Sequence, residues 1–425
     1  MNIKDEAKKM KFAAPQLAAA SMEQRNHALE LVAETLQDHA DEIFAANAKD
    51  MAAADDLGVA PAVQKRLKFN ESKLQDVLSG IAQLITLPDP LGKTSLGREL
   101  DEGLTLYRVS CPIGVIGIIF EARPDALVQI SSLCIKSGNC AILKGGKETA
   151  NTNRILFQLI HESVVAAGLP AACMLQAEQH NEISELLSCH ESVDLLIPRG
   201  SNAFVQYIMN NTKIPVMGHA DGICHIYVDE DFDMDKAIPI IVDAKTQYTA
   251  ACNATETLLV NRKIAADFLP SLAKTLAENH VQIRGTKEVN NLIGCEVIDD
   301  NAFDQEYLDL ILGIKLVDNV QEAIDHINRF GSHHTDSILT ENDAAAATFM
   351  QMVDSAGVYQ NCSTRFADGF RYGFGAEVGI STGKIHARGP VGLEGLVTYK
   401  YKLFGHGQTV SQYASGQKQF HFKDL

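Results

Sequence analysis

A regular alternation of short apolar runs and helical segments over residues 112–212 is the feature that most constrains the fold. The stretch PIGVIGIIF at 112–120 is continuously apolar, as is typical of a parallel strand that is buried on both faces. Helical patterns then alternate with strand patterns, the helices at 125–138, 149–169, 182–189 and 201–212 and the strands at 139–146, 172–177 and 192–200. Parallel strands need crossover helices, so this rhythm predicts a doubly wound α/β sheet.

The remainder of the chain divides around this sheet. Residues up to about 88 have helical spacing of apolar positions, and the Pro- and Gly-containing stretch DPLGKTSLGREL follows. The strand-helix pattern restarts at residue 223, which predicts a second α/β domain that extends to about residue 390. The last 35 residues alternate Thr, Tyr and Phe without helical periodicity. This tail is equally compatible with a strand that is added to another subunit and with a mobile segment.

Charge and cysteine usage exclude several classes of function. The formal charge of −17 would repel nucleic acid and anionic membranes. No segment has the length of a membrane span or the pattern of a secretory signal, so we expect a cytoplasmic protein. The nine cysteines are odd in number and lack C-x-x-C spacing, which predicts reduced thiols with neither disulfides nor a metal site.

Two strand ends in the first domain offer groups that bind anions. The segment ILKGGKE at 142–148 places two glycines between Lys144 and Lys147, which suits close approach of the backbone to a phosphate. The segment IPRGSNAF at 197–204 leads through Arg199 into the start of a helix. A structural turn is the alternative for the first segment, and a helix N-cap is the alternative for Ser201.

A basic, glycine-rich segment at 363–390 stands out in this acidic chain. Long irregular segments inside compact domains are usually functional. Arg365, Arg371 and Arg388 are candidate ligands for a carboxylate or phosphate, because a guanidinium group matches both geometries. Each could equally be a solvated surface charge.

Cys252 is the candidate nucleophile among the nine cysteines. Thr249, Ala250 and Ala251 are small and leave room for a substrate at the sulfur, and Asn253 could donate a hydrogen bond to a developing oxyanion. The competing interpretation is a small buried hydrophobe, because free cysteines are commonly buried and inert.

Eight segments taken together resemble the gamma-glutamyl phosphate reductases, a branch of the aldehyde dehydrogenase superfamily. They are GVIGIIFEARPDA, SGNCAILKGGKE, PRGSNAF, GHADGICHIYVD, AACNATETLLV, HHTDSILT, NCSTRFADG and GFGAEVGISTGKIHARGPVGLEGLVTYKY. The likeness is in order and spans nearly the whole chain. The stretch 317–338 also resembles a signature of that branch.

This resemblance implies the NADPH-dependent reduction of L-glutamyl 5-phosphate to glutamate 5-semialdehyde and phosphate, in proline biosynthesis. It places Cys252 at the catalytic position, where thiolate attack would give a thioester. His219 stands where hydrolytic members have a general-base Glu, and as a catalytic candidate it could tune the thiolate or contact the substrate; a packing histidine is the equal alternative. Arg123 or Asn253 would replace the Asn that helps to hold the oxyanion in the wider superfamily, and the sequence does not choose between them.

The resemblance also assigns ligands to the cofactor and the substrate. Lys144, with Gly145 and Gly146, corresponds to the strand end that contacts the adenosine ribose. The run Arg199, Gly200 and Ser201 lies near the pyrophosphate, and Glu306 corresponds to the Glu that holds the nicotinamide ribose. Arg365 is the preferred ligand of the substrate carboxylate, with His334 and Arg388 as further candidates.

The implied fold has two doubly wound α/β domains and a small β oligomerisation flap. We expect an NADPH-binding domain at 1–94 and 113–222, a catalytic domain at 223–390 and a flap at 95–112 and 391–425. A homodimer or homotetramer is expected, and a transient complex with a glutamate kinase is left open. The alternatives are a hydrolytic aldehyde dehydrogenase, against which the missing base Glu argues, and a non-catalytic nucleotide-binding member, against which the intact Cys252 argues.

Overall fold

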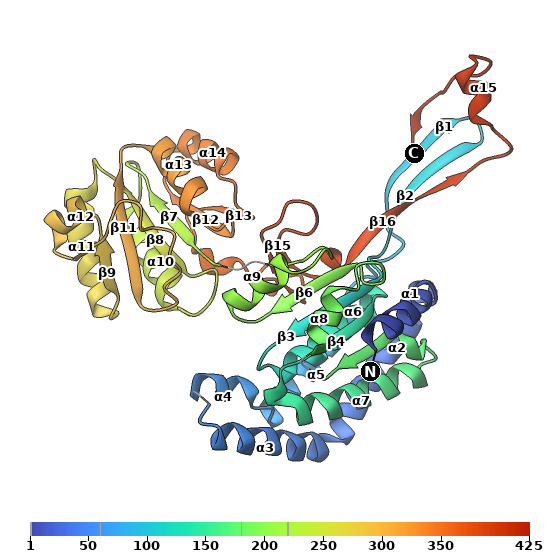
Figure 1. Cartoon of the computed structure of the whole chain (residues 1–425). Coiled ribbons are helices and arrows are strands. Elements are labelled where there is room, and N and C mark those ends of the chain that lie inside the picture. Colours follow the sequence, from blue (N-terminus) through green and yellow to red (C-terminus); the bar gives the residue numbers. More distant parts are fainter. Residues whose placement is uncertain (1, 60, 180, 219–220) are drawn as a thin grey trace. The chain divides into compact units, whose positions relative to one another are not determined.

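The computed structural model describes residues 2–59, 61–179, 181–218 and 221–425, and His219 therefore lies outside the described residues. The chain divides into two compact units (Figure 1). Unit 1 comprises residues 1–217, 375–379 and 391–425, and unit 2 comprises residues 218–374 and 380–390. The first crossing between the units thus lies at 217–218, a few residues before the boundary expected at 222.

Unit 1 contains a four-stranded parallel sheet in the order β5-β4-β3-β6. Its strands are β3 (Val115–Phe120), β4 (Cys140–Lys144), β5 (Met174–Ala177) and β6 (Leu195–Arg199). All residues of β3 and β4 are buried, as the continuous apolar runs predict. The chain builds outward from β3 to β4 and β5 and then returns to the other side of β3. The switch point lies between β3 and β6, where open α/β sheets bind ligands.

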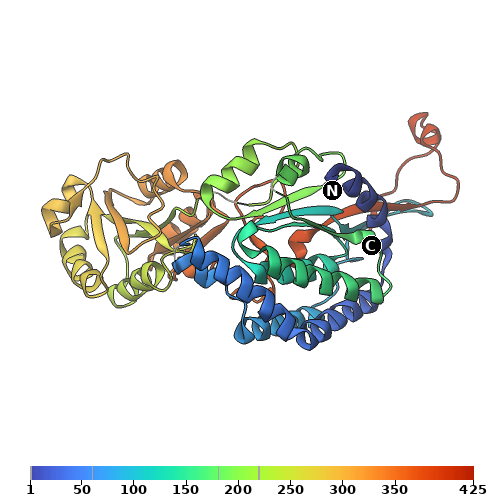
Figure 2. The same cartoon turned by 60° about the horizontal axis from the view of Figure 1, so that its bottom comes forward.

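Two groups of helices cover this sheet (Figures 1 and 2). Helix α1 (Ile3–Ala19) packs with α8 (Asn181–Leu187), and α6 (Pro124–Ser137) packs with α7 (Ala150–Ala166). The helical N-terminal segment lies against α6 and α7 through α2 (Met22–Asp38), α3 (Ala40–Asp56) and α5 (Glu71–Thr86), and α4 (Pro61–Leu67) contacts α3. Helix α9 (Asn202–Asn210) follows β6.

The flap of unit 1 is an antiparallel sheet in the order β16-β2-β1-β17 (Figure 1). Its strands are β1 (Thr94–Asp101), β2 (Leu104–Pro112), β16 (Val397–Phe404) and β17 (Lys423–Asp424), and the short helix α15 (Val410–Ala414) lies between the last two. The C-terminal tail therefore pairs with strands of its own chain and is ordered. Strand β16 remains an edge strand whose other side is not paired within this sheet.

Unit 2 is built on a seven-stranded, entirely parallel sheet in the order β10-β9-β11-β8-β7-β12-β13. The strands are β7 (Cys224–Val228), β8 (Thr255–Asn261), β9 (Gln282–Gly285), β10 (Glu296–Val297), β11 (Ile311–Val317), β12 (Thr335–Leu339) and β13 (Gly357–Gln360). The structure thus confirms the predicted fold class, with two doubly wound sheets and a small antiparallel sheet.

Side chains that alternate along the central strands of unit 2 create a separate core on each face. Leu258 and Val260 of β8 pack into one cluster, and Leu259 between them packs into the other. The first cluster is covered by α10 (Met234–Thr246), α11 (Ala265–Glu278) and α12 (Lys287–Ile293), and the second by α13 (Val320–Phe330) and α14 (Asp343–Met352). The sheet of unit 2 is therefore packed on both faces, as its buried parallel strands require.

The glycine-rich segment 363–390 has little regular structure. It contains the 3₁₀ turn η3 (Thr364–Phe366) and the paired strands β14 (Gly379–Ser381) and β15 (Gly389–Val391). Three further short 3₁₀ turns are η1 (Lys147–Thr149), η2 (Ala171–Cys173) and η4 (Leu393–Leu396). Side-chain oxygens of N-cap residues bind backbone N–H groups at the starts of α2, α5, α10, α13 and α14, the caps being Ser21, Asn70, Asp233, Asn319 and Asn342.

Candidate functional site

Cys252 lies at the amino edge of the unit 2 sheet, in the short connection between α10 and β8. Gly222 precedes β7, and His334 directly precedes β12. These two strands are neighbours in the sheet, and β8 lies on the other side of β7. Because all strands are parallel, their amino ends meet at one edge. This edge is opposite to the carboxyl edge where α/β sheets usually bind ligands.

The thiol of Cys252 is next to an imidazole. His334 Nε2 lies 3.2 Å from Cys252 Sγ, and His334 Nδ1 lies 2.9 Å from Thr335 Oγ1, which orients the ring. His334 is 1% exposed, whereas Cys252 is partly accessible. His333 before it has a left-handed φ of 59°, and its Nδ1 lies 2.7 Å from the Asp354 carbonyl oxygen. A thiol held against an imidazole is the arrangement that activates a cysteine nucleophile.

Within the described residues, none of the other eight thiols has a hydrogen bond to a histidine ring. Burial raises the pKa of every one of them, to about 12 for Cys134 and Cys173 and well above the usual range for Cys224. The remaining thiols with a raised pKa are Cys111, Cys140, Cys189, Cys295 and Cys362. Reaction requires the thiolate, so these cysteines are disfavoured as nucleophiles. The geometry therefore favours the nucleophile interpretation of Cys252.

Gly222 lies directly against the Cys252 backbone and is bonded to Glu306. A Cβ atom on Gly222 would lie within 2.5 Å of the Cα, C and O atoms of Cys252, so only glycine allows the two backbones to approach this closely. The Gly222 amide donates a hydrogen bond of 2.9 Å to Glu306 Oε1. The acid that the resemblance assigns to the cofactor is therefore tied to the backbone next to the nucleophile.

Several hydrogen bonds connect the segment around η3 to the connection between α10 and β8, which contains Cys252. Asn253 Nδ2 donates to the Ala367 carbonyl at 2.8 Å, and Thr364 Oγ1 donates to the Asn253 carbonyl at 2.7 Å. Thr255 Oγ1 and Thr364 Oγ1 lie 3.0 Å apart. Asn253 is 4% exposed, and its side-chain amide joins the two loops through this hydrogen bond.

Arg365 is a buried cation in η3, next to these hydrogen bonds. It is 8% exposed, its Nε donates to Gln247 Oε1 at 2.9 Å, and its guanidinium carbon lies 5.9 Å from the centre of the Tyr248 ring. Burial and the neighbouring Arg371 lower its pKa, and the charge of the nearby Cys252 opposes this change. No carboxylate forms an ion pair with Arg365 within the described part of the chain. A buried guanidinium without an acidic partner is suited to bind an anionic substrate.

Arg388 is placed differently. Its Nη2 lies 3.1 Å from the Asp354 carbonyl oxygen and 3.2 Å from Asp354 Oδ1, and Lys384 pairs with the same carboxylate at 2.6 Å. Both cations lower the pKa of Asp354, with Lys384 having the larger effect. In this structure Arg388 forms an ion pair that joins its loop to the connection between α14 and β13.

In unit 1, the residues expected to hold the cofactor gather at the carboxyl edge. Lys144 ends β4 and is 5% exposed; its Nζ donates to the Gly145 carbonyl at 2.6 Å. Burial lowers the pKa of Lys144, and nearby Glu182 and Glu148 oppose this. A Cβ on Gly145 would meet the Asn153 side chain, and one on Gly146 would meet Glu148. Local crowding by side chains is thus one reason for glycine at these two positions, whether or not a phosphate binds here.

Arg199, Gly200 and Ser201 form the turn from β6 into α9. This turn lies at the carboxyl edge of the sheet, at the switch point between β3 and β6. Ser201 is the N-cap of α9, but its side chain makes no capping bond. Its backbone N–H donates instead to Glu121 Oε2 at 3.2 Å, and a Cβ on Gly200 would lie 2.5 Å from the same oxygen. The carboxylate of Glu121 thus occupies the helix N-terminus at a point that attracts anions.

Arg123 is the N-cap of α6 in unit 1, where its side chain makes no capping bond. The preceding Ala122 has a left-handed φ of 48°, which is rare for a residue other than glycine. The Ala122 N–H donates to Glu148 Oε1 at 2.7 Å, which holds this turn. Glu148 therefore links the turn after β3 to the turn after β4.

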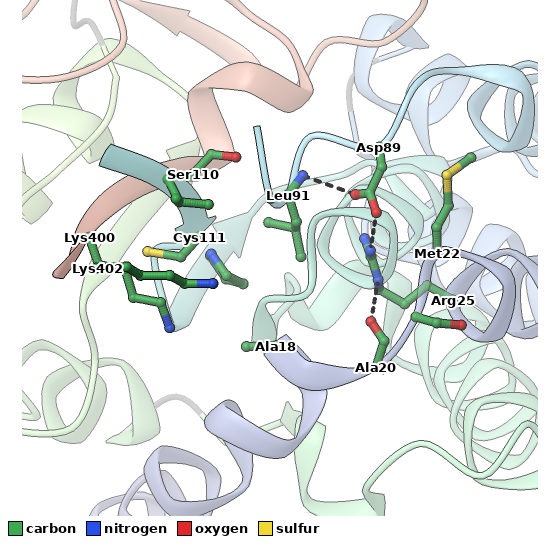
Figure 3. Close-up of a pocket in the computed structure, with 14 residues that line it drawn as sticks. Ala18, Ala20, Met22, Arg25, Asp89, Leu91, Ser110, Cys111, Lys400 and Lys402 are labelled. Atoms are coloured by element: carbon green, nitrogen blue, oxygen red, sulfur yellow. Dashed lines mark hydrogen bonds and ion pairs between the residues drawn. The ribbon is translucent and has the colours of Figure 1, made fainter. Parts of the chain in front are cut away.

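A cavity of about 260 Å³ in unit 1 lies outside the candidate site (Figure 3). Arg25 lies in its wall, where it donates to Asp89 Oδ2 at 2.7 Å and to the Lys136 carbonyl, while Lys400 and Lys402 project from β16. Arg25 is thus engaged in a structural ion pair. None of the candidate site residues lines this cavity.

Within the described residues, no group of three His, Cys, Asp or Glu side chains could hold a metal ion. Among the same residues, no helix has both the length and the apolar character of a membrane span.

Several residues at this site were not singled out from the sequence. Gln247, Thr364 and Gly222 have ordinary local patterns, and their contacts join segments up to 118 residues apart. His334 was predicted as a substrate ligand, while its place beside Cys252 Sγ depends on tertiary structure. The one available signal was that the HHT and STRF motifs belong to the same family resemblance as Cys252.

Comparisons with known proteins identify the family of this chain. The profile of the aldehyde dehydrogenase family matches residues 1–304. The chain is 55% identical over 420 residues to gamma-glutamyl phosphate reductase of Acetivibrio thermocellus, covering 99% of this chain and 97% of the relative. It is likewise 55% identical over 414 residues to gamma-glutamyl phosphate reductase 1 of Synechocystis, covering 97% of this chain and 96% of the relative.

Solved structures give the same result. The crystal structure of gamma-glutamyl phosphate reductase from Thermotoga maritima matches with a TM-score of 0.94 at 38% identity, covering 96% of this chain and all of that one. An acetylating aldehyde dehydrogenase from Geobacillus thermoglucosidasius shares the fold alone, with a TM-score of 0.62 at 16% identity, covering 96% of this chain and 97% of that one. The chain therefore belongs to the aldehyde dehydrogenase family and, within it, to the gamma-glutamyl phosphate reductases.

Proposed function

We propose that this reductase converts L-glutamyl 5-phosphate to L-glutamate 5-semialdehyde and phosphate through a thioester on Cys252, with NADPH as the reductant. The reductase activity, a step of proline biosynthesis, follows from membership of the family. The observation that carries the mechanism is the 3.2 Å contact between Cys252 Sγ and His334 Nε2 at the amino edge of the sheet.

In the first step, Cys252 Sγ forms a bond to the acyl carbon, and the bond from that carbon to the phosphate oxygen breaks. Phosphate leaves with the electron pair, and His334 Nε2 is placed to take the thiol proton. NADPH, when bound, supplies the hydride that reduces the thioester carbonyl. Collapse of the resulting thiohemiacetal restores the Cys252 thiolate and releases the aldehyde.

The residues of unit 1 fit a dinucleotide. Lys144 and Arg199 end strands on either side of β3, so both lie at the carboxyl edge next to the switch point. The start of α9 adds backbone amides at Ser201. These residues would hold the phosphates and adenosine ribose, with Glu121 leaving the Ser201 amide. Glu306 would bind the nicotinamide ribose.

Arg365 is proposed to bind the α-carboxylate of the glutamyl substrate. The Arg365→Ala variant should raise KM for glutamate 5-semialdehyde about 10- to 100-fold, because a charge-assisted hydrogen bond contributes roughly 1.5–3 kcal/mol. KM for NADP⁺ should stay within about twofold of wild type. Steady-state kinetics of the reverse reaction measure both constants. Arg262→Ala, which removes a surface arginine paired with Asp318, is the control, and an unchanged KM for the semialdehyde in Arg365→Ala would rule out this role.

The test of the function is the reaction run backwards. NADP⁺ reduction by glutamate 5-semialdehyde is followed with and without inorganic phosphate. We expect turnover only with phosphate, because the thioester must be resolved by phosphate to form the acyl phosphate.

Two other outcomes would point to other functions. Turnover without phosphate would indicate a hydrolytic aldehyde dehydrogenase. No turnover under either condition, from folded protein that binds NADP⁺, would indicate a non-catalytic member of the family.

The proposal includes assembly into a homodimer or homotetramer through the flap. Strand β16 is an edge strand, and its exposed side chains include Tyr399, Tyr401, Leu403 and Phe404. An edge with unpaired backbone groups and apolar side chains is suited to receive a strand from a second copy. A cytoplasmic location and a transient complex with a glutamate kinase remain predictions from the sequence.

A further inference from the structure

Unit 2 contains a fully buried ion pair that the reaction above does not use. Lys245, near the end of α10, places its Nζ 2.6 Å from Glu256 Oε2 on β8, and both side chains are 0% exposed. Burying two charges is costly, and a pair of apolar side chains at such positions is often equally stable. The pair therefore calls for an explanation other than stability.

Burial and mutual attraction act in opposite directions on the pKa values of this pair. Burial raises the pKa of Glu256 to about 7 and lowers the pKa of Lys245, while their mutual attraction opposes both changes. The carboxylates of Glu306 and Asp309 also act on the pair through their charges. The ion pair is thus in electrostatic contact with residues at the amino edge where Cys252 lies.

Glu256 also reaches the loop that carries Glu306. The Leu308 N–H donates to Glu256 Oε1 at 3.2 Å. Leu308 has a left-handed φ of 55°, which is unfavourable for a bulky side chain and persists only where other contacts enforce it. The bond to Glu256 is such a contact. Two residues earlier, Glu306 accepts the Gly222 N–H at 2.9 Å.

We propose that Glu256 is a positioning residue that holds the 306–308 loop, so that the Glu306 carboxylate stays on the Gly222 amide beside Cys252. Lys245 supplies the charge that lets Glu256 remain buried there. The inference rests on the proposed function, in which Glu306 binds the nicotinamide ribose. It adds a second layer of residues that act on the cofactor through Glu306 without touching it.

Two double variants separate this role from a general effect on stability. K245M/E256Q and K245M/E256L both remove the buried charges, but only glutamine keeps an oxygen that can accept the Leu308 N–H. We expect KM for NADPH to rise at least about tenfold in K245M/E256L and to stay within about threefold of wild type in K245M/E256Q. Alkylation of Cys252 by iodoacetamide should proceed at wild-type rate in both, because the Cys252–His334 contact is separate. K245M/E256A replaces the leucine variant if that protein does not fold.

Equal KM values for NADPH in both double variants, raised or unchanged, would overturn the proposal, because the acceptor oxygen would then have no role. Asp229→Asn is the structural control, since Asp229 is also buried and accepts from Tyr227 and Thr340 at the other end of β7. It should lower thermal stability without changing KM for NADPH. Wild-type turnover in the same assays tests the function itself, so failure of the two ideas is distinguishable.

Discussion

Replacing Cys252 with alanine is expected to lower kcat for semialdehyde-dependent NADP⁺ reduction by at least about 10³-fold, because no thioester can form. Cys252 is partly accessible and its side chain is small, so the loss should come with little change in thermal stability. Rapid-quench detection of an acylated enzyme should find a covalent intermediate in the wild type and none in the variant.

Cys295→Ala is the matched control for this experiment. Cys295 belongs to the same unit and is also partly accessible, but burial raises the pKa of its thiol, and its sulfur packs next to Gly285. We expect kcat within about twofold of wild type. If Cys252→Ala kept substantial turnover while Cys295→Ala lost it, the nucleophile would be assigned to the wrong cysteine.

The Gly222→Ala variant should lose activity although it adds only one methyl group. The new Cβ would overlap three backbone atoms of Cys252, none of which can rotate away as a side chain would. The two backbone segments must separate, at a cost of about 1–3 kcal/mol in stability. Displacing a nucleophile by about 1 Å costs about 10²-fold in rate. Thermal unfolding and kcat/KM measure the two effects.

Gly80→Ala provides the comparison for Gly222→Ala. Gly80 lies inside α5 and has no atom within 4 Å of the added Cβ, so alanine should stabilise the helix by about 0.5–1 kcal/mol. A Gly222→Ala enzyme with normal stability and normal kcat/KM would show that the close approach of the Gly222 and Cys252 backbones has no functional importance.

Local pattern was sufficient to predict the helical N-terminal segment and the two α/β units, whereas the flap was implied by the family resemblance. The run PIGVIGIIF became the buried strand β3, and the helical spacing of the first 88 residues became α1 to α5. Such elements are predictable because burial on both faces or along one stripe leaves a periodic trace. The sequence left the tail open between a strand and a mobile segment, because its pairing with β2 and β1 depends on residues 285 to 326 positions earlier.

The environment of the candidate nucleophile was less accessible to sequence reasoning. His334 lies 82 residues from Cys252 in the sequence, and the contact exists because β12 and β8 flank β7. Glu256 sits in a segment that reads as an apolar strand, and its partner Lys245 ends a helix. Period-based rules do not anticipate a charge in such a strand, because only the tertiary partner makes its burial tolerable.

The discontinuity of unit 1 has a consequence for biosynthesis. Unit 2 is largely one continuous stretch, whereas the β1-β2 hairpin obtains both of its neighbouring strands from the C-terminal tail. Between synthesis of β2 and β16, some 285 residues leave the ribosome, which takes roughly 15–60 s at the usual rate of translation. Throughout that interval the nascent hairpin exposes two unpaired edges. The strands of unit 2 are thus synthesised before the strands that complete the flap, so unit 2 can fold while the flap is still incomplete.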